Sequence, residues 1–141
     1  MPTKVLVVED DVLNRMFYHD VLSGSGYEVH QVDDGAQVID EVHAFKPDIV
    51  TMDIQLPNIS GLRLIRHLQR DKATREIPIL AITAFAGAQE EERIRRAGAK
   101  GYLSKPVTMN KLLDAVGSCL GADSNGENCA TARDSLDNSR E

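Results

Sequence analysis

The chain has 141 residues, which suits one domain, because single domains most often hold about 100–150 residues. Hydrophobic residues make up 42% of it, enough for an ordinary core, and no run approaches the ~20 apolar residues of a membrane span. The net charge of −6 argues against direct nucleic-acid binding. Two cysteines, Cys119 and Cys129, suggest no disulfide framework, so we expect a cytoplasmic protein without membrane insertion.

The first apolar run, Lys4–Val8, predicts a strand. It does not resemble a signal peptide, because acids follow it at once. A helix pattern over Val12–Ser23 comes next, with Asp11 as its expected N-cap and Gly24 or Gly26 as its stop signal.

The next elements are a strand over Glu28–Val32, a helix over Ala36–Phe45 and a strand over Ile49–Met52. Ser60 is expected to cap a third helix, in which apolar residues share one face: Leu64, Ile65 and Leu68.

Two further pairs complete the pattern. A strand over Ile79–Thr83 precedes a helix over Ala88–Ala97, whose early acids and late arginines complement the helix dipole. A strand over Gly101–Leu103 precedes a fifth helix, which begins after Thr108. Strand and helix thus alternate five times, which predicts a doubly wound α/β fold with a five-stranded parallel sheet between helices.

The last segment, 121–141, lacks this pattern. It has one large apolar residue, Leu136, and five acids against two arginines, a net −3. Such a segment buries too little surface to offset its ordering entropy. We therefore expect one domain over 1–120 and a disordered tail over 121–141.

Polar residues stand where four predicted strands end. Glu9 and Asp10 follow the first strand, Asp53 the third, Thr83 ends the fourth, and Lys105 follows the fifth. In a doubly wound sheet these ends gather at one edge, where ligands bind. Each residue alone has an ordinary interpretation as a helix cap, a surface hydroxyl or a solvated charge; the combination points to a site.

Crowded carboxylates repel one another unless a cation joins them, and Mg²⁺ is the hard divalent ion that combines one or two carboxylates with water and phosphate oxygen. Such a site suits Asp53 as an ionised nucleophile for a phosphoryl group. Lys105 can pair with the transferred group as a point charge, and Thr83 can donate a hydrogen bond.

The strings VVEDD, IVTMDIQLPNISG, ILAITA and YLSKP resemble the receiver domain of two-component response regulators. The resemblance covers about 4–120, and MDIQLPNISGL and EERIRRAGAKGYLSKP are most similar to small stand-alone receivers of the DivK type. It implies the CheY-like, flavodoxin-like (βα)5 fold with strand order 2-1-3-4-5. The function implied is that of a single-domain response regulator in a two-component system or phosphorelay.

The resemblance implies that Asp53 is the phosphorylation site and helps to bind the metal. It further implies that Asp10 binds Mg²⁺ directly, that Glu9 assists through water, and that the backbone carbonyl of Gln55 supplies another ligand. Mn²⁺ is expected to be able to replace Mg²⁺.

The other family roles fall on three residues. Lys105 is expected to contact the phosphoryl group and to precede a cis peptide at Pro106. Thr83 is the expected switch hydroxyl and Tyr102 the aromatic switch residue. Phosphorylation is then expected to change the surface formed by the fourth helix, fifth strand and fifth helix.

The expected phosphodonor is a sensor histidine kinase or a histidine phosphotransferase, and the expected output is a downstream protein effector. We expect the donor to meet residues around Asp53: Leu13, Asn14, Met16, Phe17 and Pro106. Loss of the phosphoryl group is expected to be slow, because Gln55 offers no acid or base to activate water and Phe85 could cover the group. The chain is therefore expected to catalyse only its own phosphorylation and slow dephosphorylation, not to turn over a substrate as an enzyme.

Four alternatives differ in identifiable features. An aspartyl-phosphate hydrolase places Asp-x-Asp after its first strand, whereas here Asp53 follows the third strand and Gln55 stands two residues on. A nucleotide binder needs a hydroxyl- or glycine-rich loop where this chain has acids. A receiver-like module that is never phosphorylated usually lacks one of Asp, Thr and Lys. A receiver cut from a hybrid kinase is the fourth, since VEDDxxNR also resembles those domains; the start methionine and the tail favour a free-standing protein.

Overall fold

The computed structural model describes residues 2–121, so nearly all of the expected disordered tail lies outside the described residues. Five parallel strands form one sheet in the order β2-β1-β3-β4-β5, which confirms the predicted fold class and strand order. Two strands run one residue further than expected, to Asp53 and to Ser104. The strands are β1 (Lys4–Val8), β2 (Glu28–Val32), β3 (Ile49–Asp53), β4 (Ile79–Thr83) and β5 (Gly101–Ser104).

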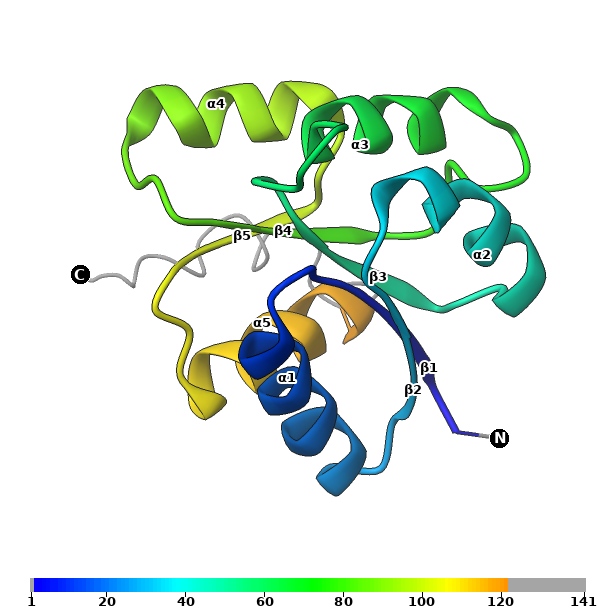
Figure 1. Cartoon of the computed structure of the whole chain (residues 1–141), viewed down its shortest axis with the longest axis vertical. Helices are drawn as coiled ribbons and strands as arrows, with labels where there is room; N and C mark the ends of the chain where they lie inside the picture. Colours follow the sequence, from blue (N-terminus) through cyan, green and yellow to red (C-terminus); the bar gives the residue numbers. More distant parts are fainter. Residues whose placement is uncertain (1, 122–141) are drawn as a thin grey trace.

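Helices cover both faces of this sheet. Figure 1 shows α2, α3 and α4 on one face and α1 and α5 on the other. Within 2–121, no helix combines the length and the apolar character needed to cross a membrane. The helices are α1 (Val12–Gly24), the 3-10 turn η1 (Gly35–Gln37), α2 (Val38–Phe45), α3 (Gly61–Arg70), α4 (Ala88–Ala97) and α5 (Met109–Gly121), the last ending one residue beyond the expected domain boundary.

Helix starts follow the predicted caps. The side chain of Asp11 accepts a hydrogen bond from the Asn14 amide at 2.9 Å, and that of Ser60 accepts one from the Leu62 amide at 3.1 Å. Each cap satisfies a backbone N–H that has no partner within its own helix.

The second predicted helix, roughly Ala36–Phe45, is helical throughout, but its first turn is a 3-10 turn. The Asp34 side chain accepts a hydrogen bond from the Ala36 amide at 2.9 Å and begins the 3-10 turn η1. Regular α-helix starts only at Val38. The local aspartate cap thus took precedence over the apolar periodicity from which the helix was predicted.

The strands build two cores because successive side chains point to opposite faces. On β1, Val5 and Val7 pack in the cluster that includes residues of α1 and α5. Leu6 and Val8 pack in the cluster that includes residues of α2, α3 and α4. Every residue of β3 and β4 is buried, which explains their almost continuously apolar sequences.

Gly61, the first residue of α3, lies against the end of β3. A Cβ atom on Gly61 would stand 2.5 Å from the carbonyl oxygen of Asp53 and 2.8 Å from Cα of Ile54. Both neighbours are backbone atoms and cannot rotate away. Only glycine therefore lets α3 begin in direct contact with the backbone of Asp53 and Ile54.

We expect Gly61→Ala to lower the free energy of unfolding by about 1–3 kcal/mol, because the added methyl group overpacks a backbone contact. Gly117→Ala is the matched control, since a Cβ at this position in α5 meets nothing within 4 Å. The control should be neutral or stabilising by up to about 1 kcal/mol. Urea denaturation measures both, and equal midpoints would contradict the close-contact argument.

Candidate functional site

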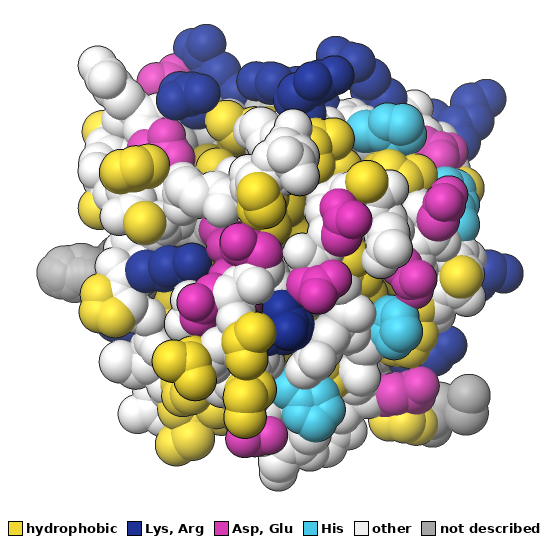
Figure 2. Space-filling model, in the orientation of Figure 1, with side chains coloured by type: hydrophobic (Ala, Val, Ile, Leu, Met, Phe, Trp, Pro, Cys, Tyr) yellow, Lys and Arg dark blue, Asp and Glu magenta, His cyan; other side chains and the backbone are white. Residues whose placement is uncertain are grey.

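Three carboxylates meet at the carboxyl edge of the sheet. The register of β1 and β3 pairs Val8 with Met52, so the next residues, Glu9 and Asp53, are neighbours. One oxygen from each of Glu9, Asp10 and Asp53 lies within 4.8 Å of the others. Glu9 and Asp53 are 1% and 2% exposed, whereas Asp10 is exposed. Figure 2 shows acidic side chains gathered near the centre of this view of the molecule.

The acidic loop is fixed from α1 by Arg15, which the sequence reasoning did not assign to the site. A guanidinium nitrogen of Arg15 donates to the carbonyl oxygens of Glu9 at 3.1 Å and Asp10 at 3.3 Å. Its position within the string VEDDxxNR was the available signal. Arg15 thus holds the loop by its backbone and leaves the carboxylates available for a ligand.

Lys105 supplies an ammonium group to this cluster from the loop after β5. Its Nζ lies 3.3 Å from Oδ2 of Asp53 and 3.5 Å from Oε1 of Glu9. Burial alone would lower the pKa of Lys105, but the charges of Asp53 and Glu9 outweigh it and raise that pKa. The Lys105–Pro106 peptide is cis, as the family resemblance implied.

Glu9 is a buried carboxyl group with a raised pKa. Burial raises the pKa of Glu9 from 4.5 to about 7, and the hydrogen-bonding and charge of Asp53 add to the rise. Its Oε2 accepts a hydrogen bond from the Asp11 amide at 3.1 Å. Its Oε1 is buried and accepts no hydrogen bond, and the Lys105 ammonium lies 3.5 Å from it. Since buried polar atoms are almost always satisfied, an oxygen with only this long contact is suited to accept a further cation.

The donor set fits Mg²⁺. All the groups are hard oxygen ligands, two of them are buried carboxylates, and exposed Asp10 leaves the cluster open to water. Lys105 supplies one positive charge in contact with these carboxylates, while Arg15 binds backbone oxygens. The predicted grouping of Glu9, Asp10 and Asp53 with Lys105 is therefore present in the structure.

Thr83, at the end of β4, lies in a network that the sequence did not predict. Its Oγ1 accepts hydrogen bonds from Nε2 of Gln55 at 2.9 Å and from the Phe85 amide at 3.1 Å, and donates to Oε2 of Glu90 at 3.2 Å. A hydroxyl has one donor and two acceptor sites. All three are in use, so this hydroxyl cannot bind another group without exchanging a partner.

Gln55 connects this network to Asp53. Its backbone N–H donates to Oδ1 of Asp53 at 3.0 Å. Its side-chain oxygen accepts a hydrogen bond from the backbone N–H of Ala84 at 2.8 Å. The sequence led us to expect a metal ligand in the backbone carbonyl of Gln55 and no acid-base role for its side chain. The side chain is also a bridge between the loops that follow β3 and β4.

Tyr102 on β5 contacts the loop between β4 and α4 at Phe85. Its half-buried ring packs against the core beneath α2, α3 and α4, and its hydroxyl donates to the Phe85 carbonyl at 3.5 Å. Burial raises the pKa of Tyr102, with a further contribution from the charge of Glu91. Phe85 itself is 62% exposed.

The residues expected to meet a phosphodonor lie on one side of Lys105. Leu13 and Met16 are 75% and 55% exposed. Figure 2 shows hydrophobic side chains gathered over α1 and the start of α5. A groove of about 470 Å³ adjoins them and is lined by Asn14, Phe17, Tyr18, Ala84, Lys105, Pro106 and Val107.

Comparisons with known proteins agree with this geometry. Residues 5–117 match the family model of the response regulator receiver domain. The chain is 40% identical over 121 residues to the polar-differentiation response regulator DivK of Brucella anthropi, covering 86% of this chain and 98% of that protein.

Two solved structures show the same fold. The receiver domain of a sensor histidine kinase from Pseudomonas aeruginosa PAO1, which holds a magnesium ion in its active-site cleft, has a TM-score of 0.78 at 30% identity, over 86% of this chain and 99% of that one. The chemotaxis response regulator CheY4 of Vibrio cholerae has a TM-score of 0.78 at 25% identity, over 82% and 97%. The chain belongs to the response regulator receiver family, whose members act as phosphoacceptors in two-component signalling.

Proposed function

We propose that Asp53 accepts a phosphoryl group from the phosphohistidine of a sensor histidine kinase or a histidine phosphotransferase. The observation that carries this proposal is a buried carboxylate at a strand end, beside a second buried carboxylate and 3.3 Å from the ammonium of Lys105. A carboxylate oxygen of Asp53 would attack phosphorus. An O–P bond would form as the P–N bond breaks, and the electron pair of that bond would stay on the imidazole nitrogen.

The residues that would hold Mg²⁺ are Asp10, Asp53, the backbone carbonyl of Gln55 and, through water, Glu9. When bound, the ion supplies neutralising charge for the carboxylates and the phosphoryl oxygens, and Mn²⁺ is proposed to replace it. Lys105 already lies beside Asp53, so its ammonium would pair with a phosphoryl oxygen without a large movement.

We place the donor on the exposed start of α1 and the loop after β5. The residues proposed to contact it are Leu13, Asn14, Met16, Phe17 and Pro106. Their exposed apolar groups flank the groove beside Lys105, which suits a helical partner that presents a histidine to Asp53. A cytoplasmic location is proposed for this encounter.

The proposed output is a change of binding surface at α4, β5 and α5, recognised by a downstream protein effector. Phosphorylation adds acceptor oxygens near Thr83, and its hydroxyl would have to leave Glu90 in order to donate to them. That movement would release the loop on which Tyr102 rests. Loss of the phosphoryl group is proposed to be slow, because Gln55 has no acid or base to activate water.

Asp53→Asn should abolish labelling by acetyl phosphate in the presence of Mg²⁺, because the amide keeps the shape but not the nucleophile. Asp40→Asn is a matched control, since Asp40 is an exposed residue of α2. The control should label as the wild type does, and chelation of Mg²⁺ should suppress its labelling. Labelling of Asp53→Asn at the wild-type level would contradict the proposal that Asp53 accepts the phosphoryl group.

The titration of Glu9 should make the metal-free protein less stable as pH rises. Since folding raises the pKa of Glu9 from 4.5 to about 7, the folded state favours the protonated form, and stability is lost between these two values. Glu9→Gln should remove this component and flatten the pH profile. Urea denaturation in a chelator at pH 5, 6, 7 and 8 measures the free energy of unfolding of the wild type and of Glu9→Gln. An identical dependence on pH in both proteins would contradict this role of Glu9.

Glu90→Ala should favour the switched state, because it removes the acceptor that holds the Thr83 hydroxyl. We expect about fivefold tighter binding of beryllofluoride with Mg²⁺, the equivalent of ~1 kcal/mol for one hydrogen bond. Glu91→Ala is the control, since Glu91 also pairs with an arginine on α4 but does not contact Thr83. Amide shifts at Ala84 and Tyr102 report the switch, and equal affinities in both variants would refute this role of Glu90.

A further inference from the structure

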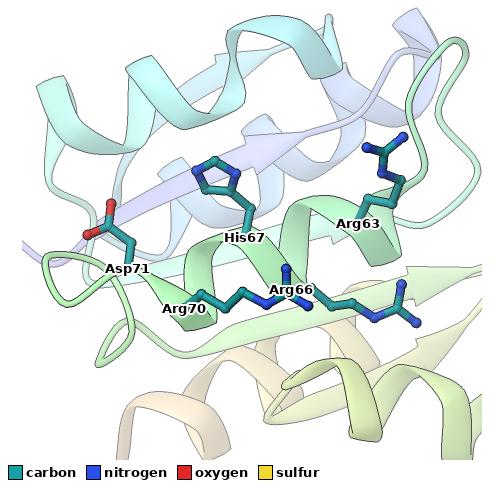
Figure 3. Close-up of a pocket in the computed structure, with 5 residues that line it drawn as sticks. All are labelled: Arg63, Arg66, His67, Arg70 and Asp71. Carbon is teal, nitrogen blue, oxygen red and sulfur yellow. The ribbon is translucent and has the colours of Figure 1, made fainter.

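The outer face of α3 is a row of arginines that the proposed phosphoryl chemistry does not use. Arg63, Arg66 and Arg70 are exposed, with exposed His67 between them, and no acid occurs within α3. Figure 3 shows Arg66 and Arg70 extending along one side of the helix, while Arg63 and His67 project from the adjacent side. In Figure 2, basic side chains line the edge of the molecule formed by α3 and α4. We call Arg63, Arg66 and Arg70 the α3 arginine row.

Within residues 2–121, no guanidinium of this row has a hydrogen bond or an ion pair. The neighbouring helix differs, because α4 neutralises its own arginines. Its ion pairs are Arg93–Glu90 at 3.4 Å, Arg95–Glu91 at 2.9 Å and Arg96–Glu92 at 2.6 Å. The α3 arginine row therefore presents uncompensated positive charge on a chain whose net charge is −6.

Part of the row works against the stability of its own helix, although Arg70, in the last turn, complements the helix dipole. Arg63 is the third residue of α3, near the positive end of the helix dipole, where a cation is unfavourable. Arg63 and Arg66 are three residues apart, and Arg66 and Arg70 four, so like charges are neighbours on one surface. The buried residues of α3 account for its packing without any of these arginines: Leu62, Leu64, Ile65 and Leu68.

The row also borders a concave surface. A groove of about 570 Å³ is lined by Arg63, Arg66, His67, Arg70 and Asp71. The one acid of this groove, Asp71, contacts the imidazole of His43 at 3.1 Å and makes no ion pair with an arginine of the row. The groove is thus a shallow site with three unpaired guanidinium groups, which suits an anionic ligand.

We propose that the α3 arginine row binds an acidic segment of a partner protein, a stretch carrying at least three Asp or Glu side chains. Guanidinium groups bind carboxylates through two parallel hydrogen bonds, which gives local and directional recognition. Seven residues of helix span about 10 Å, a length that a short acidic peptide matches.

The surroundings of the row favour a peptide over a polyanion of greater extent. A nucleic acid would bring its phosphate field close to a protein of net charge −6. A membrane would require apolar side chains beside the arginines, and the leucines and isoleucine of α3 are buried. The α3 face also lies across the sheet from α1, so an acidic partner and a phosphodonor on α1 could bind together (Figure 1).

The test is fluorescence anisotropy of a labelled ten-residue glutamate peptide with the full chain, at low and at 0.3 M salt. Changing Arg63, Arg66 and Arg70 to Gln should weaken binding about tenfold or more. The control changes Arg93, Arg95 and Arg96 to Gln, which removes the same charge from arginines that are ion-paired within α4. This control should weaken binding of the glutamate peptide about twofold at most. Salt should weaken the wild-type complex, since its contacts are ionic and exposed.

Three outcomes would overturn the proposal. One is no binding of the glutamate peptide by the wild type at low salt. Another is an equal loss in both triple variants, which would mean that net charge alone decides. The third is tighter binding of a thymidine decamer or of vesicles containing phosphatidylserine. The assay needs no phosphorylation, and labelling of Asp53 in the α3 variant, followed separately, keeps this test independent of the phosphoacceptor proposal.

Discussion

The concentration of negative charge at one end of a parallel sheet is the constraint on which the rest of the site depends. Parallel strands carry their last residues to the same edge, and here two of those edge residues are buried carboxylates, Glu9 and Asp53. One lysine lies near both, too little to balance them. Burial, with the neighbouring charge of Asp53, raises the pKa of Glu9, and its Oε1 accepts no hydrogen bond, so this edge of the sheet favours an added cation.

The surfaces that partners are proposed to use leave the acidic edge in different directions, and this follows from the layers. The groove beside Lys105 opens between α1 and the loop after β5, on the face covered by α1 and α5. The Thr83 network leads instead into α4 through Glu90. The arginine row lies on α3, between α2 and α4 (Figure 1). The proposed donor surface, the proposed output surface and the α3 arginine row thus face in different directions.

The sequence was sufficient for the features that depend on local pattern. Buried strands appear as apolar runs, Asp11 and Ser60 appear as caps, and residues at strand ends appear as a cluster once the fold class is known. It was insufficient where the path of a loop decides. The bridge from Gln55 to Thr83 joins residues 28 apart, and Glu90 meets Thr83 only because the β4–α4 loop turns back. Neither contact leaves a periodic or compositional trace, and neither has a sequence spacing that predicts it.

The absence of a side chain on Gly61 has a consequence for communication across the molecule. With no side chain between them, the first residue of α3 rests on the backbone of Asp53, so a shift of that helix would press directly on the end of β3. If a ligand on α3 prefers one position of the helix and that position alters the acidic cluster, the ligand changes the affinity of the cluster for a cation. Thermodynamic linkage then requires the cation to alter the affinity for that ligand by the same factor. The contact at Gly61 is thus a direct route by which α3 and the acidic edge would influence each other.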